Sequence, residues 1–184
     1  MTEVGQEMWR VLEDAERLFD RATIDRAVDQ LAVRVSVRLY ERNPLLMCVM
    51  KGGVSLTGDL LRRLHFPLEL DFLHATRYAD TTHGGELIWR VQPSVECKGR
   101  DVLVVDDILD GGTTLAAVRD RLHGLGARDV LTAVLVRKRL PRPRPIDADF
   151  VALECPDRYV FGRGMDYHGY WRNLAEIYAV KESK

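Results

Sequence analysis

Two stretches near the start of the chain carry apolar side chains at helical spacing. Those of the first stretch are Trp9, Leu12, Ala15, Leu18 and Phe19. Those of the second stretch, which follows Thr23 as its N-cap, are Ile24, Val28, Leu31, Ala32, Val35 and Leu39. Because a repeat of three to four residues places side chains on one face of a helix, we predict two helices that turn these faces toward the core. Asn43–Pro44 ends the second helix.

Short apolar runs alternate with helical patterns over the rest of the chain. The predicted strands are Leu45–Met50, Leu68–Phe72, Glu86–Val91, Val102–Val105, Val130–Val136 and Phe150–Leu153. The predicted helices between them are Val54–Leu64 and Thr113–Leu122. Such alternation is typical of an α/β fold with a central, mostly parallel sheet flanked by helices. We expect a single domain over residues 1–184, with a core from about 40 to 140 and a small subdomain built from the terminal segments, about 1–20 and 150–184.

Composition narrows the range of partners. The 184 residues carry 27 basic and 28 acidic side chains, and this net charge of −1 disfavours general nucleic-acid binding, which needs a basic excess. No apolar run approaches the length of a membrane span. Cys48, Cys97 and Cys155 lack the spacing of zinc ligands or of a disulfide framework, so we expect a cytoplasmic protein.

The segment Val102–Leu115, with the sequence VLVVDDILDGGTTL, holds the candidate chemistry. An apolar strand leads into Asp106 and Asp107, and Asp110 precedes two glycines and two threonines where a helix is predicted to begin. In a parallel sheet, ligands bind at the carboxyl ends of strands, and the N–H groups that begin a helix suit a phosphate. Because carboxylates repel phosphate, we expect the acids to face a divalent metal, sugar hydroxyls or a proton to be moved.

Other motifs that resemble this segment fit less well. A P-loop requires a lysine after its glycines, and none follows Gly112. A dinucleotide fingerprint needs three glycines after a strand, and the Gly162-Arg163-Gly164 run lacks the third. A phosphorelay receiver also has an acidic pair at a strand end, but early in the chain. A plain turn with solvated acids is the remaining alternative, which we disfavour because three acids within five residues adjoin two glycines.

Val102–Leu115 resembles the signature of the type I phosphoribosyltransferases, which bind 5-phosphoribosyl 1-diphosphate (PRPP). Three further segments resemble the hypoxanthine-guanine branch of that family: Met50–Gly53, Val136–Arg139 and Pro156–Asn173. The last of these resembles the C-terminal hood over the purine, which adenine-specific relatives are not expected to share. The resemblance implies the family fold, with the terminal subdomain as a hood, and transfer of the phosphoribosyl group from PRPP to hypoxanthine or guanine.

The resemblance also implies roles for the residues of the signature. Those that match the loop binding the 5-phosphate are Asp110, Gly111, Gly112, Thr113 and Thr114. Asp110 also matches the catalytic position proposed as general base toward the purine. Asp106 and Asp107 match the acidic pair that holds the ribose hydroxyls and helps to organise Mg²⁺, the implied cofactor. This ion takes few protein ligands and binds mainly substrate phosphates, which suits so few acids.

Two further groups of residues match the rest of the substrate. Lys51, Gly52 and Arg172 match contacts to the diphosphate, and relatives often hold a cis peptide bond in the first of these loops. The residues that match the purine site are Lys138, Tyr159, Val160 and Asp166. Lys138 would bind the six-position oxygen, Tyr159 would stack on the ring and the backbone of Val160 would read its edge. The acid at 166 would lie near the magnesium and the diphosphate, as a third metal-site carboxylate.

The sequence departs from the family pattern in two places. The lid, Ala75–Gly85, carries Arg77–Tyr78 where a Ser-Tyr pair is common. The phosphate loop has Gly111-Gly112-Thr113 where Thr-Gly and a larger residue are usual, so one side-chain donor to phosphate is missing. The first departure leaves open whether the arginine adds a diphosphate contact or changes how the lid closes.

Two other functions remain as alternatives at this stage. One is a phosphoribosyltransferase for xanthine or another base, and the other is an RNA-binding regulator on the same scaffold. The regulator needs a basic face, for which the arginine cluster in Arg137–Arg144 is the one candidate. We therefore expect PRPP and a 6-oxopurine base as partners, with no nucleic acid and no membrane. The apolar N-terminal helices and the family pattern suggest a homodimer or tetramer.

Overall fold

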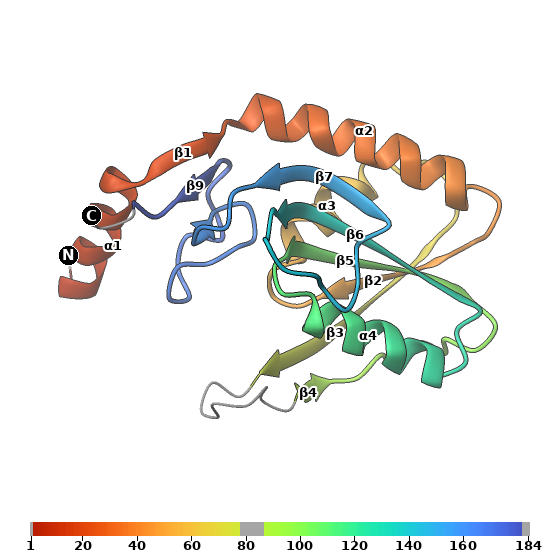
Figure 1. The fold of residues 1–184 in the computed structure, drawn as a ribbon. Helices are drawn as coiled ribbons and strands as arrows, with labels where there is room; N and C mark the ends of the chain where they lie inside the picture. Colours follow the sequence, from red (N-terminus) through yellow and green to blue (C-terminus); the bar gives the residue numbers. More distant parts are fainter. Residues whose placement is uncertain (1, 78–86, 182–184) are drawn as a thin grey trace.

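The computed structural model describes residues 2–77 and 87–181 (Figure 1). The helices are α1 (Glu3–Asp14), α2 (Arg21–Leu39), α3 (Val54–Leu61) and α4 (Thr113–Gly124). The strands are β1 (Glu16–Phe19), β2 (Leu45–Val49), β3 (Glu69–Arg77), β4 (Leu87–Val91), β5 (Asp101–Leu109), β6 (Asp129–Lys138), β7 (Phe150–Cys155), β8 (Val160–Phe161) and β9 (Ile177–Ala179). Within the described residues, every helix is too short or too polar to cross a membrane.

Six strands form the main sheet, in the order β4-β3-β2-β5-β6-β7. All neighbouring pairs are parallel except β3 and β4, which are antiparallel. The predicted α/β fold with a mostly parallel, helix-flanked sheet is therefore confirmed. Helices α2 and α3 cover one face of the sheet and α4 covers the other (Figure 1). Every residue of β2 is buried, because both faces are covered, and this explains its unbroken apolar run.

The two ends of the chain build a second, antiparallel sheet in the order β1-β9-β8. Together with the loop between β8 and β9, it forms the hood, which lies beyond the arrowheads of β5, β6 and β7 (Figure 1). The predicted small subdomain is thus confirmed, with different limits. β7 pairs with β6 and packs under α2, so the core runs from α2 to Cys155, and the C-terminal part of the hood begins after that residue and not at about 150.

The first predicted helix was wrong in its second half. α1 ends at Asp14, and Leu18 and Phe19 lie in β1, whose partner β9 is far away in the sequence. A non-local pairing of this kind overrides a local helical period. The prediction that Trp9 faces the core was also wrong, because its side chain is 49% exposed and meets Trp171 edge to face at 5.1 Å.

Several element boundaries also differ from the prediction, among them the start of α2 and the end of β5. α2 begins at Arg21, with Asp20 as its N-cap in place of Thr23, since the Asp20 Oδ1 accepts a hydrogen bond from the Thr23 N–H at 2.7 Å. β5 continues past Val105 to Leu109, because β6 pairs with it along its whole length. The acidic pair therefore sits inside a strand and not in the loop after it.

A buried ion pair fixes the start of β5. Asp101 is 2% exposed, and its carboxylate accepts hydrogen bonds from Arg128 Nε and Nη2 at 2.7 Å each and from Arg42 at 3.3 Å. The hydrogen bonds from Arg128 hold the pKa of Asp101 below its usual value, because they stabilise the ionised form.

We expect Asp101→Asn to lower the free energy of unfolding by about 1.5–3 kcal/mol at pH 7, the range for hydrogen bonds to charged groups. A lowered pKa stabilises the fold above the pKa of the unfolded chain, about 3.9, and this contribution is lost as the pH falls below it. Urea unfolding at pH 7 and pH 3 tests this, since the gap between wild type and variant should shrink at pH 3. A gap that is equal at both pH values would contradict the assignment.

Candidate functional site

The predicted phosphate loop joins β5 to α4. Gly112 has φ +80°, and a Cβ at this position would lie 3.3 Å from both Ile146 and Leu109, so conformation and space both favour glycine. α4 begins at the next residue, Thr113. The first N–H groups of a helix have no acceptors within it, and with the helix dipole they form a site for an anion. The loop therefore has the geometry of a phosphate site.

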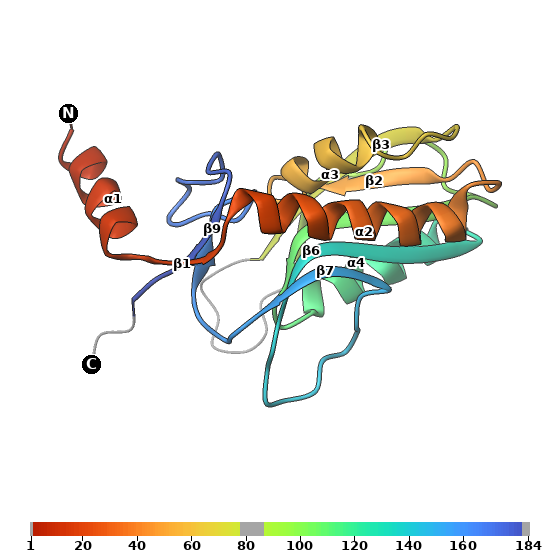
Figure 2. The same ribbon diagram turned by 90° about the horizontal axis from the view of Figure 1, so that it is seen from above.

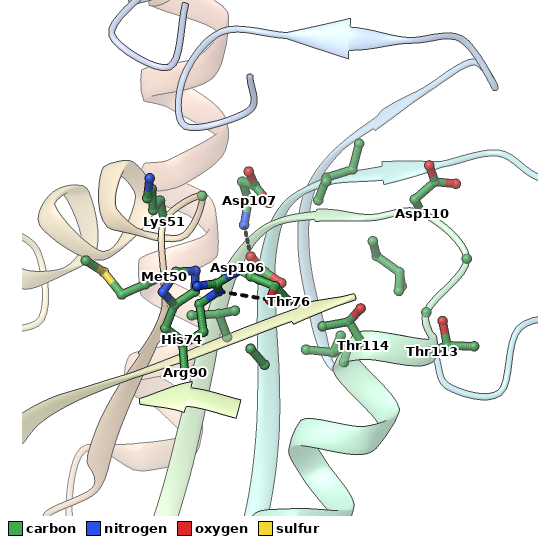
Figure 3. A pocket seen from close by; sticks show the side chains of 18 of the residues that line it. Met50, Lys51, His74, Thr76, Arg90, Asp106, Asp107, Asp110, Thr113 and Thr114 are labelled. Atoms are coloured by element: carbon green, nitrogen blue, oxygen red, sulfur yellow. Dashed lines mark hydrogen bonds between the residues drawn. The ribbon is translucent and has the colours of Figure 1, made fainter. Parts of the chain in front are cut away.

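A cavity of about 920 Å³ opens in front of this loop (Figure 3). The predicted residues that line it are Lys51, Gly52, Asp106, Asp107, Asp110, Gly111, Gly112, Thr113, Thr114 and Arg172. In Figure 3 the acidic pair lies between Lys51 on one side and Asp110 with the two threonines on the other. The structure thus brings the residues predicted for both phosphate groups and for the ribose to one cavity.

The loop before α3 touches the acidic pair directly. A Cβ added at Gly52 would lie 2.0 Å from Asp107 Oδ2, and one added at Gly53 would lie 2.4 Å from the Val105 carbonyl oxygen. Both positions accordingly require glycine as long as β5 and the carboxylate stay in place. The peptide bond between Met50 and Lys51 is cis, as the resemblance implies for this loop.

The two acids of β5 lie next to each other, with Asp107 buried and Asp106 partly buried. The Asp107 N–H donates to Asp106 Oδ1 at 2.9 Å, and Arg172 Nη1 lies 3.9 Å from Asp107 Oδ2. Burial raises the pKa of Asp106 well above its ordinary value, and the neighbouring charge of Asp107 raises it further. Burial also raises the pKa of Asp107, against the lowering effects of Asp106 and Arg172. Desolvated carboxylates of this kind are stabilised by a cation or by hydroxyl donors.

A complete metal cage is absent from the described part of the chain, since no three His, Cys, Asp or Glu side chains there come together as ligands. The predicted three-acid set, Asp106, Asp107 and Asp166, is therefore not assembled. Instead, Arg172 Nη2 lies 2.5 Å from Asp166 Oδ1, and the Gly169 N–H donates to Oδ2 at 2.7 Å. Asp166 thus positions the arginine. The adjacent pair in β5 has the donor chemistry for Mg²⁺ held mainly by substrate phosphates.

A smaller pocket of about 190 Å³ adjoins the large cavity at Asp107, Ile108 and Asp110, which line both. Its lining residues are Asp107, Ile108, Asp110, Lys138, Tyr159, Val160, Met165 and Asp166. All four residues predicted for the purine are among them. Lys138 Nζ lies 2.8 Å from Asp110 Oδ2, so the predicted base and the predicted purine-binding lysine form an ion pair. Asp107 and Asp110 line both the large cavity and this pocket.

The hood supplies an aromatic wall to the small pocket. Tyr159 is 51% exposed, and its hydroxyl donates to the Asp166 carbonyl oxygen at 3.2 Å. Its ring also meets Tyr167 edge to face at 5.5 Å, which fixes the plane of the ring. A half-exposed ring held in place is suited to stacking on a flat heterocycle.

The geometry agrees with what comparison with known proteins finds. The sequence-family model of the phosphoribosyl transferase domain matches residues 14–168 of the chain. The chain belongs to the phosphoribosyltransferase family. A hypoxanthine-guanine phosphoribosyltransferase of Bacillus subtilis is 33% identical over 167 residues, which cover 89% of this chain and 92% of the relative. A hypoxanthine-guanine-xanthine phosphoribosyltransferase of Tritrichomonas foetus is 30% identical over 175 residues, 94% of this chain and 96% of that one.

Solved structures give the same result. A crystal structure of a hypoxanthine phosphoribosyltransferase from Staphylococcus aureus superposes with a TM-score of 0.85 at 28% identity, over 98% of this chain and 96% of the other. The resemblance to the hypoxanthine-guanine branch of the phosphoribosyltransferase family is thereby confirmed, over nearly the whole chain.

Three side chains that the sequence analysis missed also line the large cavity of this phosphoribosyltransferase: His74, Arg90 and Arg142. His74 and Arg90 lie side by side in Figure 3, on the adjacent strands β3 and β4. Burial lowers the pKa of His74, and the charges of Arg90 and Lys51 lower it further. The polar residues at the carboxyl end of β3 were a usable signal, because they end at the same sheet edge as the acids of β5. No signal marked Arg142.

The lid prediction falls at the limit of the described residues. Arg77 is the last residue of β3 and pairs with Leu87, whereas Tyr78 lies outside the residues that the structure describes. The roles of both therefore stay predictions.

Proposed function

We propose that this phosphoribosyltransferase transfers the 5-phosphoribosyl group of PRPP to hypoxanthine or guanine, giving the nucleoside monophosphate and diphosphate. One observation carries the proposal: a small pocket with a lysine and a tyrosine adjoins a large cavity with a phosphate loop, and Asp107 and Asp110 line both. A flat base in the first and a phosphorylated sugar in the second would meet at these carboxylates. The names of the relatives support the same reaction.

Each part of PRPP has a counterpart in the cavity. The amides of Gly111 and Gly112 and the hydroxyls of Thr113 and Thr114 would hold the 5-phosphate. The carboxylates of the acidic pair in β5 would accept hydrogen bonds from the ribose hydroxyls. The same pair would hold Mg²⁺, which supplies positive charge for the departing diphosphate when it is bound.

The diphosphate would lie between the loop before α3 and the hood. Lys51 and Gly52 would contact it from one side and Arg172 from the other, since all three line the same cavity. Arg90 adds positive charge to this part of the wall, and His74, whose pKa is lowered by burial, adds a neutral imidazole. Positive charge around a leaving diphosphate stabilises the transition state, in which the sugar approaches an oxocarbenium ion.

Asp110 would take the proton that the purine imidazole ring loses. Its carboxylate lies at the boundary of the two spaces, where the ring nitrogen and the anomeric carbon would meet. The ion pair with Lys138 orients the carboxylate from the purine side. Lys138 would in turn donate to the six-position oxygen of an oxopurine.

The proposal is tested by incubating the protein with PRPP and Mg²⁺ and each of four free bases: hypoxanthine, guanine, xanthine and uracil. Formation of inosine and guanosine monophosphates is the expected result. Turnover of xanthine or uracil alone would overturn the assignment of the base, and turnover of none would overturn the activity. An RNA-binding regulator is disfavoured because two of the four arginines of the Arg137–Arg144 cluster are engaged internally: Arg137 pairs with Asp147 and Glu154, and Arg144 donates to the Asp110 carbonyl oxygen.

Lys138→Ala is expected to reduce the preference for oxopurines over adenine by about tenfold or more, because a site built to donate to a substrate oxygen loses that donor. The PRPP affinity should change by less than about threefold, since the lysine does not line the large cavity. Ratios of kcat/KM for hypoxanthine and adenine, with PRPP binding measured separately, decide the matter. A loss confined to PRPP affinity would mean that this lysine is misplaced.

We also propose that the protein is a cytoplasmic homo-oligomer. Leu70 and Phe72 project from the same face of β3 and are 48% and 46% exposed. Apolar side chains clustered in this way favour a protein–protein contact. Light scattering after size exclusion distinguishes a dimer or tetramer from a monomer. The three cysteines are buried and free, which supports a reducing compartment.

A further inference from the structure

An ion cluster with a buried centre joins the hood to two helices of the core. Arg163, in the loop between β8 and β9, donates from Nη2 to Asp59 Oδ2 at 2.6 Å and to Asp25 Oδ1 at 3.2 Å. Asp59 belongs to α3 and Asp25 to α2, and the start of α2 lies beside the hood in both views (Figures 1 and 2). The side chains of Arg163 and Asp59 are only 13% and 6% exposed. None of the three residues lines the large cavity or the small pocket.

The backbone around Arg163 leads directly to the diphosphate site. Gly162, Arg163 and Gly164 all have positive φ angles, of 98°, 52° and 109°. The Gly164 carbonyl oxygen accepts a hydrogen bond from Arg172 Nη1 at 2.7 Å. A Cβ at Gly164 would lie 2.4 Å from the Gly52 carbonyl oxygen, so this loop and the loop before α3 are in close contact. Gly164, the residue next to Arg163, thus contacts both Arg172 and Gly52, two of the proposed diphosphate contacts.

The other end of the ion pair reaches the same site through α3. This helix starts at Val54, directly after the loop Lys51–Gly53, and Asp59 lies in its second turn. By binding Asp59, Arg163 holds α3, and with it the loop before α3, at a fixed distance from the hood. The two sides of the diphosphate site come from these two segments.

Stability alone explains this cluster poorly. Desolvating two charges costs free energy that their attraction often only offsets, so a buried ion pair adds little net stability compared with apolar packing. In addition, the Nε of Arg163 is buried and has no hydrogen-bond partner, which costs further free energy. What such a pair does supply is a defined geometry between the elements that it joins.

We propose that Arg163 is a positioning residue for the diphosphate of PRPP: through Asp59 and Asp25 it sets the Lys51–Gly53 loop against Gly164 and Arg172. The inference rests on the proposed function and deepens it. It implies that loss of Arg163 weakens binding of PRPP and diphosphate more than binding of a nucleoside monophosphate, which has no diphosphate.

The test compares Arg163→Met with Arg62→Met. Arg62 also pairs with Asp59, at 2.5 Å, but it is the C-cap of α3 and is 72% exposed, so its loss removes a partner of the same carboxylate without freeing the hood. We expect Arg163→Met to raise the KM for PRPP about tenfold, with the Kd for inosine monophosphate within about twofold of wild type. Arg62→Met should leave both constants within about twofold. Measurements are made well below the melting temperature of each variant.

The outcomes separate the two levels of the claim. If wild type turns over no base in the same assay, the proposed function fails and the inference with it. If wild type is active and Arg163→Met has the KM of Arg62→Met, or weakens PRPP and the monophosphate equally, the inference alone is overturned. Should Arg163→Met fail to fold, Asp59→Asn is measured in its place. That variant keeps the size of the side chain, and an unchanged KM for PRPP would likewise overturn the inference.

Discussion

Asp110→Asn is expected to lower kcat by about 10²- to 10⁴-fold, the usual contribution of general acid–base catalysis. The amide cannot accept the purine proton, although it still fills the same space between the two pockets. Affinity for PRPP should stay within about threefold of wild type, because the backbone N–H groups of the phosphate loop are unchanged. Steady-state kinetics with hypoxanthine, combined with PRPP binding by calorimetry, measures both quantities.

Asp157→Asn is the matched control for this variant. Asp157 lies 3.8 Å from the same Lys138 Nζ, and its side chain is 51% exposed, as is that of Asp110. It does not line either pocket. Its loss should change kcat by less than about twofold, because an exposed ion pair contributes little. Equal losses of kcat in the two variants would show that catalysis depends on the negative charge around Lys138 and not on Asp110 as general base. An unchanged kcat in Asp110→Asn would remove this residue from the mechanism.

Gly52→Ala is expected to lower kcat/KM by about 10²-fold or more. The added Cβ would lie 2.0 Å from Asp107 Oδ2, so either the buried carboxylate or the whole loop has to move. A shift of about 1 Å in groups that orient a substrate can cost two orders of magnitude in rate. Both KM for PRPP and kcat should suffer, since this loop and this acid lie on the same cavity.

Gly58→Ala controls for the substitution itself. This glycine lies in α3, and a Cβ there would meet nothing within 4 Å. Alanine should raise the free energy of unfolding by about 0.5–1 kcal/mol, because it favours the helix and restricts the unfolded chain, with no change in activity. Near-wild-type activity of Gly52→Ala would show that the loop relaxes freely, which would contradict the rigid fit described for it.

The fold could be predicted where elements are set by their own residues and by burial. Apolar runs such as Leu45–Met50 and Val130–Val136 identified buried parallel strands, because a strand covered on both faces has no polar side. The predicted helix was wrong at Leu18–Phe19, because their extended backbone depends on pairing with β9, which is far away in the sequence. A helical period carries no information about such a distant partner.

The same distinction holds for the site. The phosphate loop is contiguous in the sequence, so its residue pattern was enough to predict that Asp110–Thr114 would lie together at the ligand cavity. Residues that arrive at the cavity from separate strands or loops, such as His74, Arg90 and Arg142, have no shared pattern in the sequence. For Asp166 the resemblance indicated the right neighbourhood, but the ligand set depends on side-chain directions, and here Arg172 occupies the carboxylate. Arg163 was noticed only as part of a rejected motif, because the acids that bind it lie more than 100 residues earlier.

The pairing of β1 with β9 has a consequence for how the protein is made. β1 precedes the whole main sheet in the chain, and β9, its one partner in the described part of the chain, follows all of it. The strands of the main sheet are all synthesised before β9. The nascent chain can therefore fold the main sheet and its phosphate loop before the hood is complete. The aromatic wall that Tyr159 forms in the small pocket is fixed only after β9 has been synthesised. A translation product that stops before Ile177 would therefore retain the phosphate loop but lack a complete small pocket for the purine.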